Sequence, residues 1–250
     1  MDQNIVSITD ELQDGSGRIL LEGFPDVGLV GVIAVSYLVE KLQLKQVGSI
    51  DSDLLPSAVA VHDSQVKEIM RIYGNDLLVA VISEIPLPAS LVRPVAQSLL
   101  AWCKAKKINS VISLGGLPEP NRLDIEVPSV FLVASEKDFG EHMMNKIGAQ
   151  RLKDGFITGV KAELLREGIR RKHNIAFLLA QAHYNYPDPG AAAQIVLSLS
   201  KLIGREIDVK PLLESAEEVK IQLRDLMRRT SDSMHRTQKG REMEAPSLYV

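Results

Sequence analysis

Apolar and polar residues follow two alternating patterns along the first two hundred residues of the chain. Short apolar runs that end at glycine or polar residues are typical of buried strands. Between these runs, apolar residues recur every three or four positions, which is the pattern of an amphipathic helix. We predict strands at residues 18–23, 46–50, 57–61, 68–73, 76–83, 110–114, 128–134 and 175–180. We predict helices at residues 28–44, 90–107, 138–147, 159–172 and 190–202.

This alternation of elements favours one fold class. Buried strands that alternate with helices are typical of a mostly parallel sheet with helices on both faces, so we predict a three-layer α/β domain. The chain has 250 residues, which fits one large domain or one domain with an extension. We assign residues 1–208 to the α/β core domain.

The last helical segment, residues 209–232, has a different period. Its apolar residues step by four, three, four and three positions, which is a heptad repeat. These residues are Leu212, Ala216, Val219, Leu223 and Leu226. The pattern predicts a helix that ends near residue 230 and allows two interpretations. The helix is either an oligomerisation helix or a terminal helix packed on its own domain.

Residues 233–250 are polar and charged, and they predict a flexible tail. They contain few core-forming residues, and Gly240 and Pro246 disfavour a helix. Such a tail spans about 50 Å when fully extended. The alternative is an ordinary frayed terminus.

The tail ends in Leu248, Tyr249 and Val250, which form a hydrophobic-Tyr-X docking motif. The terminal carboxylate of Val250 can pair with a lysine in a partner's pocket. The ring of Tyr249 buries apolar area, and Leu248 adds a side contact. About one chain in a hundred would end this way by chance, so the motif alone is suggestive.

Composition excludes several classes of function. Apolar residues make up 45% and charged residues 24%, and the net charge is −3, so no global basic field indicates nucleic-acid binding. A single cysteine, Cys103, excludes an intrachain disulfide and is expected to be buried. The N-terminus lacks a secretory pattern, and the apolar run at 27–39 is too short for a bilayer. We expect a cytoplasmic protein without a membrane partner.

Two glycine segments are the candidates for ligand chemistry. Residues 23–31 open the helix predicted at residues 28–44, and glycines at a helix start can bind phosphate. Their spacing matches no nucleotide motif, however, and close packing is favoured. Gly115 and Gly116 follow a predicted strand, at the sheet edge where α/β proteins bind ligands, and a tight turn is favoured there. The five histidines form no metal-binding pair, so we expect no metal. The chain has no G-x-S-x-G elbow and no nucleotide-binding motif, so we expect no catalytic residues and no cofactor.

Three segments resemble the signatures of the proteasome assembly chaperone 2 family. Residues 23–31, Gly-Phe-Pro-Asp-Val-Gly-Leu-Val-Gly, resemble its N-terminal signature, and Gly115-Gly116 resembles its central double glycine. Residues 186–193 and 204–208 resemble its C-terminal segment. The resemblance covers roughly residues 20–227, and the archaeal members with a hydrophobic-Tyr-X tail are the most similar. Residues 154–159 differ from the glycine- and methionine-rich loop of many members.

The resemblance implies a fold akin to nucleoside phosphorylases without a catalytic role. It also implies a homo-oligomer, with a tetramer as the first expectation and a pentamer as the alternative. Its tails would dock between subunits of the α-ring of the proteasome core particle, as in an assembly chaperone or an ATP-independent activator. Two other interpretations stay open: an enzyme or binding module for a nucleoside or phosphorylated compound that uses the glycine segments, and a plain structural oligomer.

Overall fold

The computed structural model describes residues 5–244, with side chains up to residue 235. Its centre is a nine-stranded sheet in the order β1-β3-β6-β7-β2-β8-β11-β9-β10. The strands are β1 (Ser7–Asp10), β2 (Ile19–Gly23), β3 (Lys45–Asp51), β6 (Met70–Gly74), β7 (Leu78–Ser83), β8 (Ser110–Pro118), β9 (Val130–Ala134), β10 (Gln150–Arg151) and β11 (Asn174–Ala182). A separate hairpin pairs β4 (Ala60–His62) with β5 (Gln65–Lys67).

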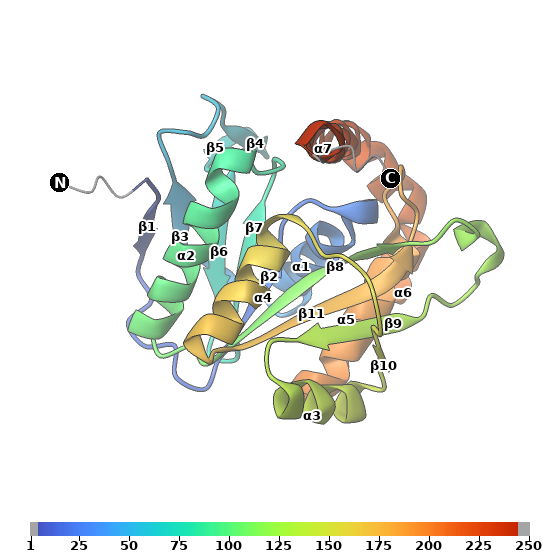
Figure 1. Cartoon of the computed structure of the whole chain (residues 1–250), viewed down its shortest axis with the longest axis horizontal. Coiled ribbons are helices and arrows are strands. Elements are labelled where there is room, and N and C mark those ends of the chain that lie inside the picture. The colour runs from blue at the N-terminus through green and yellow to red at the C-terminus, as the bar shows by residue number, and fades with distance from the viewer. Residues whose placement is uncertain (1–4, 245–250) are drawn as a thin grey trace, which may run out of the picture.

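Helices cover both faces of the sheet (Figure 1). They are α1 (Val30–Lys41), α2 (Ala89–Ala105), α3 (Lys137–Ile147), α4 (Gly159–Arg171), α5 (Pro189–Ile203), α6 (Lys210–Glu214) and α7 (Ala216–Glu244), with 3-10 turns η1 (Val27–Leu29) and η2 (Arg122–Asp124). Figure 1 shows α2 and α4 in front of the sheet, with α1 and α5 behind it. The predicted three-layer α/β fold is confirmed.

The sheet is parallel at its centre and antiparallel toward both sides. Strands β7, β2, β8 and β11 are parallel neighbours. Strand β6 runs antiparallel to β3 and β7, and β9 runs antiparallel to β11 but parallel to the short edge strand β10. The central strands are buried on both faces, which explains their continuous apolar runs. Along β11, Ile175 and Phe177 face α2 and α4, and Ala176 and Leu178 face α1 and α5.

The sequence did not predict β1, β5 or β10, which are short. Strand β1 is held by contacts far away in the chain. Asp10 accepts a hydrogen bond from Trp102 Nε1 at 2.8 Å, and its other oxygen lies 2.8 Å from the ammonium of Lys106. Because both partners come from the end of α2, no local pattern reveals this edge strand.

Glycines bring α1 unusually close to the sheet. A Cβ atom on Gly31 would lie 2.3 Å from the carbonyl oxygen of Leu114 in β8, and one on Gly23 would lie 2.6 Å from the carbonyl oxygen of Gly31. The segment 23–31 therefore packs backbone against backbone, which confirms the packing interpretation of its glycines. Cys103 is fully buried, as predicted, and burial raises the pKa of its thiol to about 12.

The C-terminal helix differs from its prediction in two ways. It is interrupted at Ser215, where the backbone angles of φ −87° and ψ 12° depart from the helix, and the hydroxyl of Ser215 donates to the carbonyl of Pro211 at 2.9 Å. It also does not end near residue 230, because α7 continues to Glu244 and includes most of the predicted tail. Thr230 is buried and donates its hydroxyl to the carbonyl of Leu226 at 2.8 Å, which satisfies this polar group within the helix.

The heptad stripe of α6 and α7 lies against the chain's own core. Leu212 and Met227 are buried, while Val219, Leu223 and Leu226 are half-buried and pack against the cluster formed by α1 and α5. Met234 extends this contact by two further turns. Figure 1 shows α7 along the top of the molecule. No helix within residues 5–244 is both long and apolar enough to cross a membrane.

We predict that Gly31→Ala destabilises the protein. Glycine to alanine inside a helix ordinarily raises the free energy of unfolding by about 0.5–1 kcal/mol. Here the added Cβ meets a backbone oxygen that cannot move without moving β8, so a loss of about 2 kcal/mol or more is expected. Urea unfolding measures the change. Ser36→Ala, at an exposed position of the same helix, is the matched control and should change it by less than about 0.5 kcal/mol.

Candidate functional site

Buried charged side chains gather at the carboxyl ends of the central parallel strands. This edge is where α/β sheets commonly bind ligands, because loops and helix ends meet there. Two clusters occupy it. One contains Glu22, Asp26 and Lys161, and the other contains Arg122 and Asp188.

The first cluster is built around a buried lysine. Lys161, in the first turn of α4, points to the sheet, and its ammonium lies 3.3 Å from Glu22 Oε1 and 3.6 Å from Asp26 Oδ2. It also lies 3.3 Å from the carbonyl oxygen of Phe24 and 5.7 Å from the ring centre of Phe177. Glu22 is fully buried, because it occupies a position of β2 that faces α2 and α4.

Asp26 reaches this cluster because β8 carries glycines opposite it. A Cβ atom on Gly115 would lie 1.9 Å from Asp26 Oδ2, and the backbone nitrogen of Gly116 donates to the same oxygen at 3.3 Å. Two carboxylate oxygens, Glu22 Oε2 and Asp26 Oδ1, are buried without a hydrogen-bond partner in the structure. The cluster therefore holds two acids and one base with incomplete hydrogen bonding.

This composition shifts the pKa values of its members. Burial raises the pKa of Asp26 to about 7, since the nearby Glu22 adds to the shift and the attraction of Lys161 only partly opposes it. Burial alone would lower the pKa of Lys161, but the carboxylates of Asp26 and Glu22 raise it above its ordinary value. Lys161 is thus a cation, and Asp26 is the group whose charge changes near neutral pH.

The second cluster is a closed ion pair. Arg122 donates Nε to Asp188 Oδ2 at 2.8 Å and Nη2 to Asp188 Oδ1 at 3.0 Å, and its Nη1 donates to the carbonyl of Ile125. Asp188 also accepts backbone hydrogen bonds from His183 and from Ala191, the latter as the N-cap of α5. Both side chains are buried and well satisfied, so this pair fixes the loop that follows β8 onto the start of α5.

The turn η1 connects the two clusters. It follows Asp26 directly, and the carbonyl oxygen of Gly28 accepts a hydrogen bond from the backbone of Asp188 at 2.9 Å. Gly28 and Leu29 both have left-handed backbone angles, with φ of 64° and 50°. For buried Leu29 this conformation costs about 1–2 kcal/mol, which the surrounding packing must offset. Helix α7 packs against η1 from the other side.

The sequence profile of the PAC2 family matches residues 20–227, which include both clusters and η1. The chain belongs to the PAC2 family. It is similar in structure to PbaA of Pyrococcus furiosus, an archaeal homologue of proteasome-assembly chaperone, with a TM-score of 0.85, 30% identity, and coverage of 92% of this chain and 99% of PbaA.

Two further similarities extend over most of this PAC2 protein. PbaB of Pyrococcus furiosus, an archaeal proteasome activator, has a TM-score of 0.75 and 25% identity, covering 90% of this chain and 99% of PbaB. An uncharacterised protein of Methanocaldococcus jannaschii is 23% identical over 221 residues, which is 88% of this chain and 90% of that protein.

The predicted site residues of this PAC2 protein are only partly within the structure. The docking motif Leu248, Tyr249 and Val250 lies outside the described residues. Gly115 and Gly116 do not form the predicted tight turn, because β8 continues through them to Pro118 and needs them for the approach of Asp26 and Val27.

The heptad residues lie on one stripe of α6 and α7, as described above, and their role in oligomerisation stays a prediction. Within a single chain they fit the second interpretation, a terminal helix packed on its own domain.

The charged residues of the two clusters were missed by the sequence analysis. Lys161 had a usable signal, since it lies on the apolar side of α4 beside Val160, Leu164 and Leu165. Asp188 had another, because Asp-Pro is a common start of a helix. Glu22 had no such signal, because it lies within an otherwise apolar strand. Among the described residues, no group of three or more acidic, histidine or cysteine side chains is arranged to hold a metal.

The neighbourhood of η1 argues against phosphate binding by residues 23–31. The cations beside this turn, Lys161 and Arg122, are already paired with the carboxylates of Asp26 and Asp188. Leu29, Val30 and Gly31 are fully or nearly fully buried. Neither a free cation nor an accessible run of backbone N–H groups is therefore offered to an anion by the described residues of this turn. This packing favours a structural role for residues 23–31, and the nucleoside or phosphate interpretation of this PAC2 protein stays a prediction.

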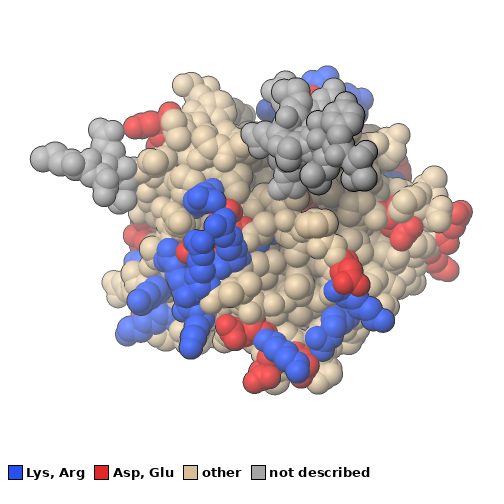
Figure 2. All heavy atoms as spheres, in the orientation of Figure 1, with Lys and Arg blue, Asp and Glu red and all other residues tan. Residues whose placement is uncertain are grey.

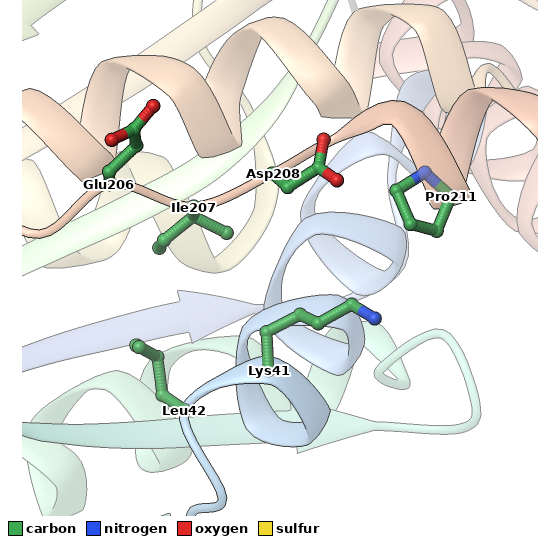
Figure 3. A pocket seen from close by; sticks show the side chains of 6 residues that line it. All are labelled: Lys41, Leu42, Glu206, Ile207, Asp208 and Pro211. Atoms are coloured by element: carbon green, nitrogen blue, oxygen red, sulfur yellow. The ribbon is translucent and has the colours of Figure 1, made fainter.

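A small surface pocket lies away from both clusters. It is formed where the end of α1 meets the chain before α6, and it is lined by Lys41, Leu42, Glu206, Ile207, Asp208 and Pro211 (Figure 3). Tyr37 joins the same two segments, because its hydroxyl donates to the carbonyl of Asp208 at 2.7 Å. The pocket thus lies where the chain before α6 packs against the end of α1.

We predict that Asp26→Asn changes how stability depends on pH. The pKa of Asp26 is about 7 in the folded protein against an ordinary value of 3.8, so the folded state binds the extra proton more tightly. This contribution to stability is complete below about pH 4 and is lost as the pH rises through 7. The variant should therefore be more stable than the parent by about 1–2 kcal/mol at pH 8, with a smaller difference at pH 5.

Urea unfolding at several pH values between 5 and 8 measures this difference. Asp154→Asn removes an exposed carboxylate and serves as the control, whose profile should run parallel to that of the parent. A profile for Asp26→Asn that is also parallel would show that Asp26 does not titrate in this window.

We predict that Asp188→Asn destabilises this PAC2 protein by about 3–5 kcal/mol, because it leaves Arg122 as a buried cation without its partner. Asparagine keeps the helix N-cap, so loss of the cap does not contribute. The double variant Arg122→Met/Asp188→Asn should recover much of the loss. Additive effects of the two substitutions in thermal unfolding would contradict the assignment of a coupled pair.

Proposed function

We propose that this protein binds the proteasome core particle through its C-terminal tails, as an assembly chaperone homologue or an ATP-independent activator. The observation that carries the proposal is a PAC2 fold on a chain that ends in Leu248-Tyr249-Val250. PbaA and PbaB, which are named as a chaperone homologue and a proteasome activator, support it. The tails would dock in the pockets between α-ring subunits, in the cytoplasm and without a catalytic step.

The length of α7 limits how far the docking motif can lie from the folded body. The described part of α7 extends to Glu244, and Leu248-Tyr249-Val250 follow within six residues in the sequence. Six residues span at most about 20 Å in any conformation, much less than the tail predicted from sequence. A short connection to a packed helix restricts the positions of the motif, which lowers the entropy lost when it binds.

Several tails acting together would provide the affinity that one cannot. A three-residue motif buries far less than the roughly 800 Å² per partner of a stable interface. We propose that α6 and α7 contribute to a homo-oligomer, a tetramer or a pentamer, which raises the avidity of its tails. Within the heptad stripe, Ala216, Val219, Leu223 and Leu226 keep some exposure for such contact, whereas Leu212 is already buried.

We predict that Tyr249→Ala weakens binding to purified core particle by about 2 kcal/mol per docked tail, since a buried aromatic ring is removed. Surface plasmon resonance with immobilised core particle measures the change. Deletion of residues 248–250 should abolish binding. Hydrolysis of a short fluorogenic peptide, measured in parallel, separates an activator, which raises the rate, from a silent chaperone.

Two control variants make this experiment specific. Tyr249→Phe keeps the ring and should retain most of the affinity. Phe156→Ala removes a fully exposed aromatic side chain from the body and should leave binding unchanged. Equal binding by the parent and by Tyr249→Ala would exclude docking through the tail.

A further inference from the structure

The outer face of α2 and α4 is strongly basic in a chain with a net charge of −3. Helix α2 contains no acidic residue, and the last turns of α4 are rich in arginine. The exposed cations of these helices and the residue after α4 are Arg93, Lys104, Arg166, Arg170, Arg171 and Lys172. Figure 2 shows lysine and arginine side chains gathered on this face. We call it the α2–α4 basic face.

The two acidic residues of α4 lie beneath these arginines. The side chains of Glu163 and Glu167 are 16% and 5% exposed. Glu163 Oε1 lies 3.4 Å from Arg93 and 3.1 Å from Arg166. One partly buried acid and one buried acid beneath six exposed cations leave a clear excess of positive charge toward the solvent.

Glu167 acts in the same way at the end of α4. Its carboxylate lies 3.2 Å from the guanidinium of Arg170 and 2.8 Å from that of Arg171. Because these carboxylates lie beneath the arginines, they hold the guanidinium groups in place and do not compete with an external anion at the surface. Fixed guanidinium groups lose less entropy when they bind an anion, and they match the two oxygens of a carboxylate.

One apolar side chain stands among the arginines. Ile169 is 63% exposed and lies on the outer side of α4 next to Arg166 and Arg170. The single aromatic residue of α2 and α4, Trp102, is buried, so this face offers no ring for base stacking. Arginine is enriched in protein–protein interfaces, and Ile169 adds an apolar contact among the arginines.

We propose that the α2–α4 basic face is a docking surface for an acidic segment of another protein, with an aliphatic residue of that segment against Ile169. The charge complementarity would steer the encounter and set orientation. This surface is formed by described residues of the folded body. Its binding is therefore independent of the C-terminal motif.

The test uses the full chain and a short fluorescent peptide of glutamate with interspersed leucine. Fluorescence anisotropy at about 50 mM salt measures its affinity, since charge contacts are weakly screened there. Arg166→Gln/Arg170→Gln should weaken binding about tenfold. Both carboxylates keep one arginine partner in this variant, Arg93 and Arg171 respectively, so the fold is retained. Circular dichroism checks this.

Matched variants distinguish binding at the α2–α4 basic face from nonspecific attraction to any exposed cation. Arg151→Gln/Lys153→Gln removes two exposed cations elsewhere and should change the affinity less than about twofold. Ile169→Gln should weaken the leucine-containing peptide but not an all-glutamate peptide. Deletion of residues 248–250 should leave peptide binding intact, so this result is independent of the outcome with core particle.

Three outcomes would overturn the proposal. One is equal weakening by the two double-cation variants, which would show that only net charge matters. Another is displacement of the peptide by an equal concentration of single-stranded RNA, which would assign the face to nucleic acid. A third is a changed oligomer mass of Arg166→Gln/Arg170→Gln in light scattering, which would make the face a contact between copies.

Discussion

The backbone of residues 23–31 lies in direct contact with β8, and much of the structure depends on this approach. It is possible because Gly23, Gly31, Gly115 and Gly116 carry no side chain at the contact. The approach puts Asp26 over the carboxyl end of β8 and leaves its carboxylate within reach of Lys161. A close backbone contact thus determines where charge is buried, and that charge lies where other α/β proteins place a ligand.

The two charged clusters have different characters. Arg122 and Asp188 satisfy each other and the adjacent backbone, which is the pattern of a pair that fixes a loop. Glu22, Asp26 and Lys161 leave two carboxylate oxygens unpaired, and one acid shifts its pKa toward neutrality. Since η1 lies between the clusters and under α7, a change of charge at Asp26 occurs next to the helix that leads to the C-terminus.

The sequence was sufficient for the central elements and insufficient for contacts between distant segments. Continuous apolar runs located β2, β7, β8 and β11, because strands buried on both faces have no polar side. Strand β1 was missed, since its partners Trp102 and Lys106 lie far along the chain. The prediction ended the C-terminal helix too early, because it gave more weight to the polar composition of residues 233–250 than to Met227, Thr230 and Met234. The spacing of these three residues continues the buried stripe. Burial of Glu22 and Lys161 depends on which strand and helix face each other, and no local pattern encodes that.

The continuity of α7 fixes the direction of the chain at the end of the described residues. Along a helix, each residue advances the chain by 1.5 Å and turns it by about 100°. Helix α7 packs on η1 and the core through Val219, Leu223 and Met227, so its rotation about its own axis is fixed. The direction in which the chain leaves residue 244 therefore depends on the number of residues between these contacts and residue 244. One residue inserted after these contacts would therefore rotate the exit to a different side of the helix, although the chain would be longer. Three or four inserted residues, close to one turn, would nearly restore the original direction.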